Sequence, residues 1–270
     1  MSQVGQIPDS LIDVILPIRP RPPRLEKVLQ SLNSQDHQDW RLISLLDRDD
    51  GSNQSLIEQV VGDRPKIFVA CDYSKQSFPE MLNNGLLRST ATYVARQDDD
   101  DISAPTRFRS QLVFFRENPG VQLVSGNAAV VNEAGQLLFR ITQPENPVEL
   151  CRSILSENII PHSSVMFQRT AVVGIGGYDE KMRGCEDYDL WLRILSWSSI
   201  RSVNIEVVEV LQHEGGMSRQ RLQTSVVHKL NSSRIAACRR LELPIRTGVK
   251  DSLLWSFKQL APEWIRQIAK

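Results

Sequence analysis

Between residues 12 and 120, short apolar runs alternate with stretches in which apolar residues recur at helical spacing. The short runs predict buried strands, and the stretches with helical spacing predict amphipathic helices. The predicted strands are Ile12–Leu16, Arg41–Leu46, Lys66–Ala70 and Thr92–Ala95. The predicted helices are Leu25–Ser34, Gln54–Val61, Pro79–Ser89 and a fourth from about Pro105 to the stop signal at Asn118. This alternating order predicts parallel strands whose following loops meet at one edge of the sheet.

The rest of the chain has a less regular pattern. Its predicted strands are Val121–Ser125, Ala128–Val131, Leu137–Ile141, Ser163–Phe167 and Ile205–Leu211. Predicted turns at residues 126–127 and 133–135 suggest hairpins and mixed sheet edges. A tight turn is expected at residues 174–177, and a helix from about Asp187 to Trp197. Gly215-Gly216 marks the expected end of an α/β body over residues 1–216, which a helical extension over residues 217–270 follows.

Composition is that of an ordinary globular protein. The 270 residues are 41% hydrophobic and 24% charged, which is compatible with one large core. The four cysteines form no Cys-x-x-Cys pair, so neither a zinc site nor a disulfide framework is indicated. Residues 1–9 are polar, and no apolar run approaches the ~20 residues that span a bilayer. We therefore expect a cytoplasmic protein.

The net charge is zero, but it is unevenly distributed. From Arg219 to the end there are eleven basic and three acidic residues, so this part carries +8 and the preceding part −8. A helix is predicted at Val226–Arg240, and apolar residues from Leu253 to Ile265 interleave with basic ones. The segment is either a helical cap on the body or an interfacial segment attracted to anionic lipid at the inner face of the membrane. It contains no recognisable nucleic-acid-binding module, so no nucleic acid partner is expected.

Four consecutive aspartates, Asp98–Asp101, follow the predicted strand that ends at Ala95. Adjacent carboxylates repel one another and need a cation, hydrogen-bond donors or bulk water to coexist. The run is either a solvated acidic loop or a ligand site, and its place at the carboxyl end of a strand favours a ligand. Oxygen ligands favour Mg²⁺ or Mn²⁺, which such sites share with substrate phosphates.

A second acidic cluster, Glu186-Asp187-Tyr188-Asp189, opens the last predicted helix of the body. Carboxylates in a first turn are favoured by the helix dipole, so capping explains some of them. A carboxylate beside a cleft also suits a general base. His213 and His162 are each either a ligand contact or an ordinary surface residue. No P-loop or dinucleotide fingerprint is present, which disfavours kinases and dehydrogenases.

Several short stretches together form a more specific pattern. They are Val14–Pro17, Ser31–Gln35, Asp49–Ser52, Asn83–Leu86, Tyr93–Asp101 with Pro105 and Gln111, His162–Phe167, Gly176–Asp179 and Glu186–Arg193. In order and spacing they resemble glycosyltransferase family 2 over roughly residues 11–220. The resemblance implies a GT-A fold, in which a Rossmann-like, mostly parallel central sheet is flanked by helices, here with a helical C-terminal extension.

The resemblance implies that Pro17, Arg19 and Asp47 line the pocket for the nucleotide base. Arg19 and the prolines after it replace the tyrosine and asparagine that are common in the family at this point. Either Asp47 or Asp49 meets the base, and Asp47 is favoured because it directly ends the strand. No Gln-x-x-Arg-Trp sequence is present, so a processive polymer synthase is not expected.

The acidic run is similar to the Asp-x-Asp motif of that family. Asp98 would approach the ribose or the metal, and Asp100 would coordinate a divalent cation on the diphosphate. Asp99 belongs to the same donor-binding run and, like Asp101, is expected to serve structure, solvation or a second shell around the ligand. His213 falls where family members place a residue near the diphosphate, and we count it with Asp100 as a metal ligand.

Asp187 would be the base that deprotonates the acceptor hydroxyl. The sequence is thereby expected to encode an inverting glycosyltransferase that depends on Mn²⁺ or Mg²⁺. Its donor would be a nucleoside-diphosphate sugar, with UDP as the expected carrier, and its acceptor a glycan or lipid-linked glycan. The alternatives are a nucleotidyltransferase and a non-catalytic relative that binds nucleotide-sugars.

Overall fold

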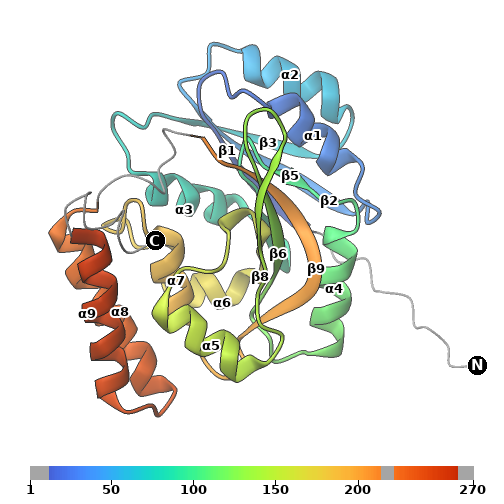
Figure 1. The fold of residues 1–270 in the computed structure, drawn as a ribbon. Coiled ribbons are helices and arrows are strands. Elements are labelled where there is room, and N and C mark those ends of the chain that lie inside the picture. Colours follow the sequence, from blue (N-terminus) through green and yellow to red (C-terminus); the bar gives the residue numbers. More distant parts are fainter. Residues whose placement is uncertain (1–11, 214–221, 261–270) are drawn as a thin grey trace, which may run out of the picture.

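The computed structural model describes residues 12–213 and 222–260. Within these ranges one large sheet has the strand order β3-β2-β1-β4-β8-β6-β9-β5, and β7 pairs with β6 beside that path (Figure 1). The strands are β1 (Ile12–Ile18), β2 (Trp40–Asp47), β3 (Lys66–Cys71), β4 (Tyr93–Arg96), β5 (Ile102–Ser103), β6 (Leu123–Val131), β7 (Leu137–Ile141), β8 (Met166–Gln168) and β9 (Ile200–Leu211). The helices are α1 (Leu25–Asn33), α2 (Ser52–Val61), α3 (Phe78–Arg88), α4 (Arg107–Glu117), α5 (Pro147–Ser156), η1 (His162–Ser164), α6 (Arg169–Gly174), α7 (Glu186–Ile194), α8 (Thr224–Arg240) and α9 (Ile245–Leu260).

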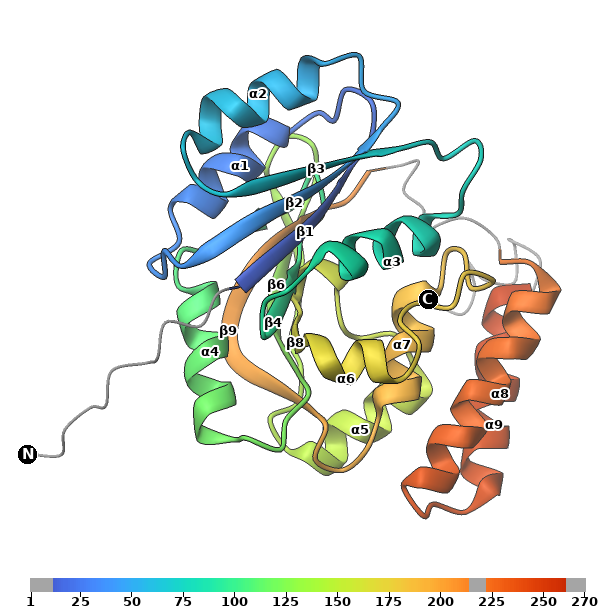
Figure 2. The ribbon, with the colours of Figure 1, turned by 180° about the vertical axis from the view of Figure 1, so that it is seen from behind.

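The first half confirms the predicted alternation of strands and helices. β1 pairs in parallel with β2 on one side and with β4 on the other, and β2 pairs in parallel with β3. Helices α1 and α2 cover one face of these strands, and α3 covers the other (Figure 2). Successive side chains of a strand point to opposite faces, so Val14 packs in the core beneath α1 and Ile15 in the core beneath α3. Burial on both faces explains why β1 is apolar at every position except Asp13.

The second half differs from the prediction first at β6. This strand is continuous, so the turn predicted at Gly126-Asn127 is wrong, and a register shift against β9 lies at those residues instead. A Cβ atom on Gly126 would lie 2.6 Å from Cγ1 of Val207 on β9. The glycine therefore marks a close approach of two strands and not a chain reversal.

Other element boundaries also differ from the prediction. β9 begins at Ile200, earlier than predicted, and α7 ends at Ile194 rather than Trp197. Residues 163–167 are divided between η1 and β8, whereas the predicted hairpin of β6 and β7 is confirmed. β5, α5 and α6 were not predicted. β5 has only two residues, too few to show a period of two.

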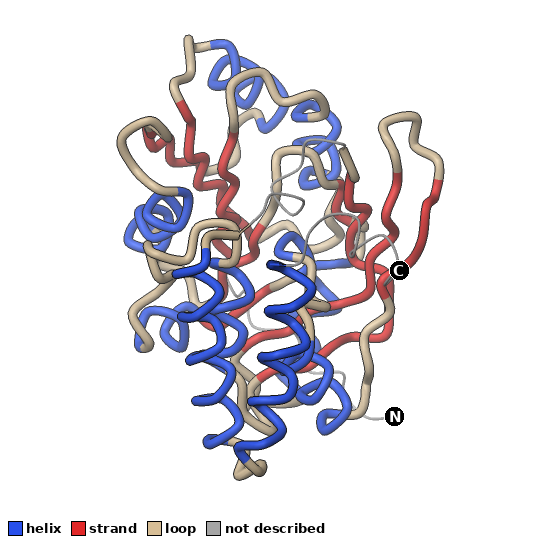
Figure 3. The backbone as a smooth tube through the Cα atoms, turned by 60° about the vertical axis from the view of Figure 1, so that its left-hand side comes forward, coloured by secondary structure: helices blue, strands red, loops and turns tan. Residues whose placement is uncertain are grey.

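The C-terminal helices α8 and α9 form an antiparallel pair beside α7 (Figure 3). Val227, Leu230 and Trp255 belong to the same core cluster as α5 and α7. Arg234 of α8 is fully buried and donates through Nε to the carbonyl oxygen of Leu155 at 2.6 Å. The described part of the extension therefore caps the body, while the predicted boundary at residue 216 lies outside the described residues.

One face of α9 carries exposed apolar residues at a spacing of four. They are Ile245, Val249 and Leu253, and they lie beside Arg246 and Lys250. Contact of this face with anionic lipid stays a prediction that co-sedimentation with anionic vesicles tests. Among residues 12–213 and 222–260, no helix is both long and apolar enough to cross a membrane.

Asp13 joins the strands that lead to the candidate site. Its fully buried carboxylate on β1 accepts two hydrogen bonds from Arg41 of β2, at 2.7 and 2.8 Å. It also accepts from the hydroxyl of Ser89 at 2.7 Å and from the N–H groups of Thr90 and Ala91 at 2.9 and 3.1 Å. Burial raises the pKa of Asp13, but these hydrogen bonds outweigh burial and lower the pKa overall. One ionised side chain thus connects β1, β2 and the loop before β4.

We expect Asp13→Asn to lower the free energy of unfolding by about 3 kcal/mol at pH 7, because it leaves Arg41 without its carboxylate. The folded-state pKa of Asp13 lies below the unfolded value, so its stabilisation is present above the unfolded pKa and is lost as pH falls through the folded one. Urea unfolding at pH 7 and below about pH 4 measures this, and the gap between variant and wild type should narrow in acid. The exposed Asp63→Asn is the control and should change stability by less than about 0.5 kcal/mol. A gap that stays the same at both pH values would contradict the assignment.

Candidate active site

The candidate site lies where β1, β2 and β4 end, because parallel strands place their carboxyl ends at one edge of a sheet. β9 reaches the same place, since it pairs with β5 directly after the acidic run. Side chains at this edge line a cavity of about 410 Å³. The lining residues are Pro17, Arg19, Tyr73, Phe78, Asp98, Asp99, Asp100, Asp101, Arg183, Val210, Leu211 and His213. They include every predicted donor-binding or metal residue except Asp47.

Arg19, in the loop after β1, binds two of the four aspartates. Its backbone N–H donates to Oδ2 of Asp99 at 2.8 Å, and its Nε donates to Oδ1 of Asp99 at 3.0 Å. Its Nη2 lies 2.9 Å from Oδ1 of Asp99 and also donates to Oδ2 of Asp100. Burial raises the pKa of Asp99 to about 6, although the charge and the N–H of Arg19 act to lower it. The guanidinium therefore compensates two carboxylates that repel each other.

Arg96, the last residue of β4, binds a third aspartate. Its Nη2 donates to Oδ1 of Asp98 at 2.6 Å, and its side chain is 1% exposed. Burial acts to lower the pKa of Arg96, but the charge of Asp98 opposes burial and the pKa is raised overall. Nε and Nη1 of Arg96 have no hydrogen-bond partner in the part of the chain that the structure describes. A buried, charged guanidinium thus lies next to the acidic run.

Asp101 is buried and bound by the second half of the chain. It accepts from the hydroxyl of Ser163 and, at 2.9 Å, from the N–H of Leu211. Burial, together with the charges of Asp98 and Asp100, raises the pKa of Asp101 well above its usual value. Asp101 therefore joins the acidic run to η1 and β9, and this contact is structural.

Asp100 and His213, the two predicted metal ligands, lie together. His213 Nε2 is 2.6 Å from Oδ2 of Asp100. No group of three or more histidine, cysteine or acidic side chains converges as a metal site within residues 12–213 and 222–260. Magnesium and manganese commonly take only one or two protein carboxylates and complete their shell with water and substrate phosphates. The residues present fit a cation held in that way.

The two candidates for base recognition, Asp47 at the end of β2 and Asp49 in the loop after it, make different contacts. Asp47 is 1% exposed, and its Oδ1 accepts from the N–H of Tyr73 at 2.9 Å. Asp49 binds the first turn of α2, because its two oxygens accept from the N–H groups of Asn53 and Gln54 at 3.1 and 3.0 Å. Asp47 thus binds the backbone of Tyr73, which lines the cavity, and both oxygens of Asp49 bind α2. The role of Asp47 in binding the base stays a prediction.

Asp187 is held at the first turn of α7 outside the set of cavity-lining residues. Asn158 donates to its Oδ2 at 2.8 Å, and the N–H of Tyr188 donates to its Oδ1 at 2.7 Å. Burial raises the pKa of Asp187 and the charge of Asp98 adds to this, while Asn158 and the N–H group act to lower it. Burial and the charge of Asp187 also raise the pKa of Glu186 to about 7. The acidic run and the second acidic cluster therefore influence each other electrostatically.

His162 is partly buried next to these groups. Its Nε2 is 2.9 Å from the hydroxyl of Tyr178, and its ring meets that of Trp191 edge to face at 5.7 Å. Burial and the charge of Arg96 hold the pKa of His162 well below its usual value. The imidazole is therefore neutral, and its contacts are those of a packed, partly buried side chain.

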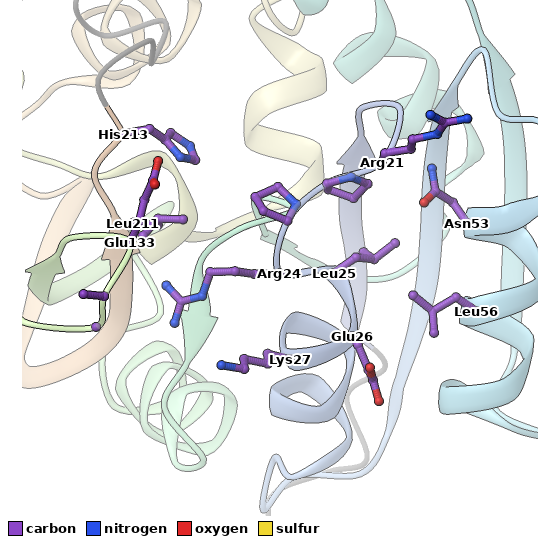
Figure 4. Close-up of a pocket in the computed structure, with 14 residues that line it drawn as sticks. Arg21, Arg24, Leu25, Glu26, Lys27, Asn53, Leu56, Glu133, Leu211 and His213 are labelled. Atoms are coloured by element: carbon purple, nitrogen blue, oxygen red, sulfur yellow. The ribbon is translucent and has the colours of Figure 1, made fainter.

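A second cavity, of about 670 Å³, shares Leu211 and His213 with the first. It lies between the start of α1 and the turn that joins β6 to β7 (Figure 4). Figure 4 shows Arg24 and Arg21 pointing in opposite directions from the loop after β1. Arg24 donates to Glu209 of β9 at 2.6 Å, which holds this loop against the strand that leads to His213.

Sequence reasoning missed Arg96, Tyr73 and Arg183. Tyr73 follows the end of β3, and its position at the same sheet edge was a signal for it. Arg96 closes an apolar strand with a charge directly before the acidic run, which also marks it as unusual. Arg183 lies in the irregular loop before α7, and no periodic signal places it.

Comparison with known proteins gives a consistent result. A family model described as "Glycosyltransferase like family 2" matches residues 14–228. Putative glycosyltransferase EpsE of Bacillus subtilis is 28% identical over 229 residues, which cover 82% of this chain and 79% of EpsE. The O-antigen biosynthesis glycosyltransferase WbnJ of Escherichia coli is 26% identical over 189 residues, which cover 69% of this chain and 72% of WbnJ.

Solved structures show the same fold. Residues 1–349 of S. aureus TarS in complex with UDP-GlcNAc superpose with a TM-score of 0.69 at 12% identity, covering 89% of this chain and 70% of that one. The mannosyltransferase PcManGT of Pyrobaculum calidifontis, in complex with GDP-Man and Mn²⁺, gives a TM-score of 0.62 at 16% identity and covers 94% and 71%. These likenesses confirm the predicted GT-A fold.

We expect His162→Gln to make stability less sensitive to acid. The folded-state pKa of His162 is depressed, so below about pH 6.5 the unfolded chain takes up a proton that the folded chain does not. This contribution costs the wild type about 1.4 kcal/mol per pH unit at most. Urea unfolding at pH 7 and pH 5.5 should show a smaller acid-induced loss in the variant, whereas His228→Gln, at an exposed position of α8, should behave like the wild type. Equal losses in wild type and His162→Gln would show that His162 titrates normally.

Proposed function

The chain belongs to the glycosyltransferase-like family 2, and from this we propose that it is a metal-dependent, inverting glycosyltransferase with a nucleoside-diphosphate sugar as donor. The observation that carries the proposal is the pairing of two acidic groups. The run Asp98–Asp101 lines a cavity at the sheet edge, and Asp187 lies close enough to Asp98 for the two charges to interact. The acidic run suits a cation bound to the donor diphosphate, and Asp187 suits the deprotonation of the acceptor hydroxyl.

On the donor side, the diphosphate is a poor leaving group unless its developing negative charge is neutralised. Asp100 and His213 are the residues that would hold a divalent cation there, and a bound cation would supply this neutralisation. The chain itself places Arg19 at Asp100 and Arg96 at Asp98. These two guanidinium groups limit the net negative charge that an incoming diphosphate meets.

On the acceptor side, an alcohol is a weak nucleophile until a base removes its proton. Asp187 has a pKa raised by burial, which brings its basicity closer to the value that serves a general base near neutral pH. Asn158 and the N–H of Tyr188 hold the carboxylate in place. A single displacement with one base inverts the configuration at the anomeric carbon, which is the outcome we propose.

The carrier and the acceptor are finer parts of the proposal. UDP as carrier is supported by TarS, which has been solved with UDP and with UDP-GlcNAc. PcManGT has been solved with GDP-Man and Mn²⁺, which supports a divalent cation and leaves GDP as the competing carrier. A glycan or lipid-linked glycan as acceptor is supported by the name of WbnJ, an O-antigen biosynthesis glycosyltransferase.

UDP should bind more tightly in the presence of Mn²⁺, and Asp100→Ala should remove most of this difference. The reason is that a cation on Asp100 bridges the protein to the diphosphate. Isothermal titration of UDP with and without Mn²⁺ measures the effect, with Asp63→Asn on the surface as control. Equal UDP affinity with and without metal in the wild type would count against a shared cation.

A parallel panel of nucleotide-sugars identifies the donor, and pyrophosphate release from a nucleoside triphosphate would indicate a nucleotidyltransferase instead.

Asp187→Asn should retain UDP binding and lose sugar transfer by a factor of about 10² or more, because the amide cannot accept the proton. The measurement pairs UDP titration with single-turnover transfer from the donor that the panel identifies. Glu180→Gln, on the exposed segment before α7, removes a nearby charge and should leave transfer unchanged. Full transfer activity in Asp187→Asn would exclude Asp187 as the base.

A further inference from the structure

Arg19 occupies an unusual position among the side chains of the donor cavity. Its guanidinium lies between Asp99 and Asp100, the latter being one of the two residues that would hold a divalent cation. Oδ2 of Asp100 is shared, because Arg19 Nη2 and His213 Nε2 both contact it. The guanidinium therefore binds the oxygen of Asp100 that also contacts His213, the other predicted metal ligand.

Two features allow this guanidinium to move without unfolding the loop. The backbone N–H of Arg19 is bound independently to Asp99 at 2.8 Å, which fixes the Cα position. The side chain itself is 41% exposed and faces the cavity. Asp99 and Asp100, in contrast, are about nine-tenths buried, at 9% and 11% side-chain exposure. The carboxylates are therefore buried, whereas the guanidinium that binds them belongs to a partly exposed side chain.

We propose that Arg19 is an internal counter-ion that competes with the divalent cation for Asp100 and moves to the diphosphate when the donor binds. The proposal rests on the proposed function for its ligand, a nucleoside diphosphate. A guanidinium and a divalent cation bound to the same carboxylate oxygen weaken each other's binding, because like charges a few ångströms apart repel in a partly buried site. The planar fork of arginine binds carboxylate and phosphate with the same bidentate geometry, so it can exchange one for the other.

This exchange couples the two ligands. In the free protein Arg19 weakens metal binding, because the cation must displace it. When a diphosphate is present, Arg19 has a new partner and the carboxylate becomes available to the metal. UDP then raises Mn²⁺ affinity both by direct contact with the metal and by removing Arg19, and the second contribution is absent without the guanidinium.

The first experiment titrates Mn²⁺ alone into wild type, Arg19→Gln and Arg21→Gln, with folding of each checked by thermal unfolding. We expect Arg19→Gln to bind Mn²⁺ at least tenfold more tightly than the wild type. Arg21→Gln is the matched control: it removes one positive charge two residues away, from a side chain that is 87% exposed and 4.0 Å from Asp50. Its Mn²⁺ affinity should equal that of the wild type. Equal or weaker Mn²⁺ binding in Arg19→Gln, including no binding in either protein, would overturn the proposal.

The second experiment measures UDP binding without metal and the factor by which UDP raises Mn²⁺ affinity. Both quantities should fall in Arg19→Gln. Arg19→Lys keeps the charge but lacks the fork, so its Mn²⁺ affinity should lie between those of wild type and Arg19→Gln; this variant also serves if Arg19→Gln folds poorly. An unchanged enhancement factor in Arg19→Gln would show that Arg19 does not exchange partners.

These results are separable from the proposed function. A wild type that turns over no nucleotide-sugar, combined with tighter Mn²⁺ binding in Arg19→Gln, refutes the transferase reaction and keeps the competition. Normal sugar transfer by the wild type, combined with unchanged Mn²⁺ binding in Arg19→Gln, refutes the competition and keeps the transferase.

Discussion

The structure around the donor cavity depends on how four adjacent carboxylates are kept apart. Each aspartate of the run Asp98–Asp101 has different partners. Asp98 binds the buried Arg96, and Asp99 binds Arg19 through both backbone and side chain. Asp101 accepts from the N–H of Leu211, and Asp100 contacts His213 and one end of Arg19. The aspartates, which repel one another, are thereby bound to four separate parts of the fold.

Those attachments explain why distant segments must meet here. Arg19 comes from the loop after β1, Ser163 from η1, and Leu211 and His213 from the end of β9. β5 places β9 beside the run, because Ile102 pairs with Glu209 directly after Asp101. The irregular second half of the chain is therefore as necessary to the site as the alternating first half. Asp13 contributes from the opposite ends of the strands by fixing β1 against β2.

The sequence predicted those features that depend on local pattern. Buried strands, amphipathic helices and the common edge of parallel strands all follow from periodicity, and so the placement of Asp98 and Asp100 at that edge could be anticipated. Contacts between distant residues left no such signal. Arg19 and Asp99 are 80 positions apart, and nothing in the spacing of either indicates the pair. Gly126 was misread as a turn because a glycine that admits Val207 and a glycine that reverses the chain look alike in sequence.

Arg96 connects the two halves of the candidate site. A general base near an acidic run tends to be protonated, because each neighbouring carboxylate raises its pKa. The charge of Asp98 acts on Asp187 in this way, and Arg96 acts in the opposite sense on both Asp187 and Glu186. The same guanidinium that binds Asp98 therefore limits the cost of ionising the proposed base. If Asp187 is the base, positive charge beside it favours its ionised form, and Arg96 supplies such a charge.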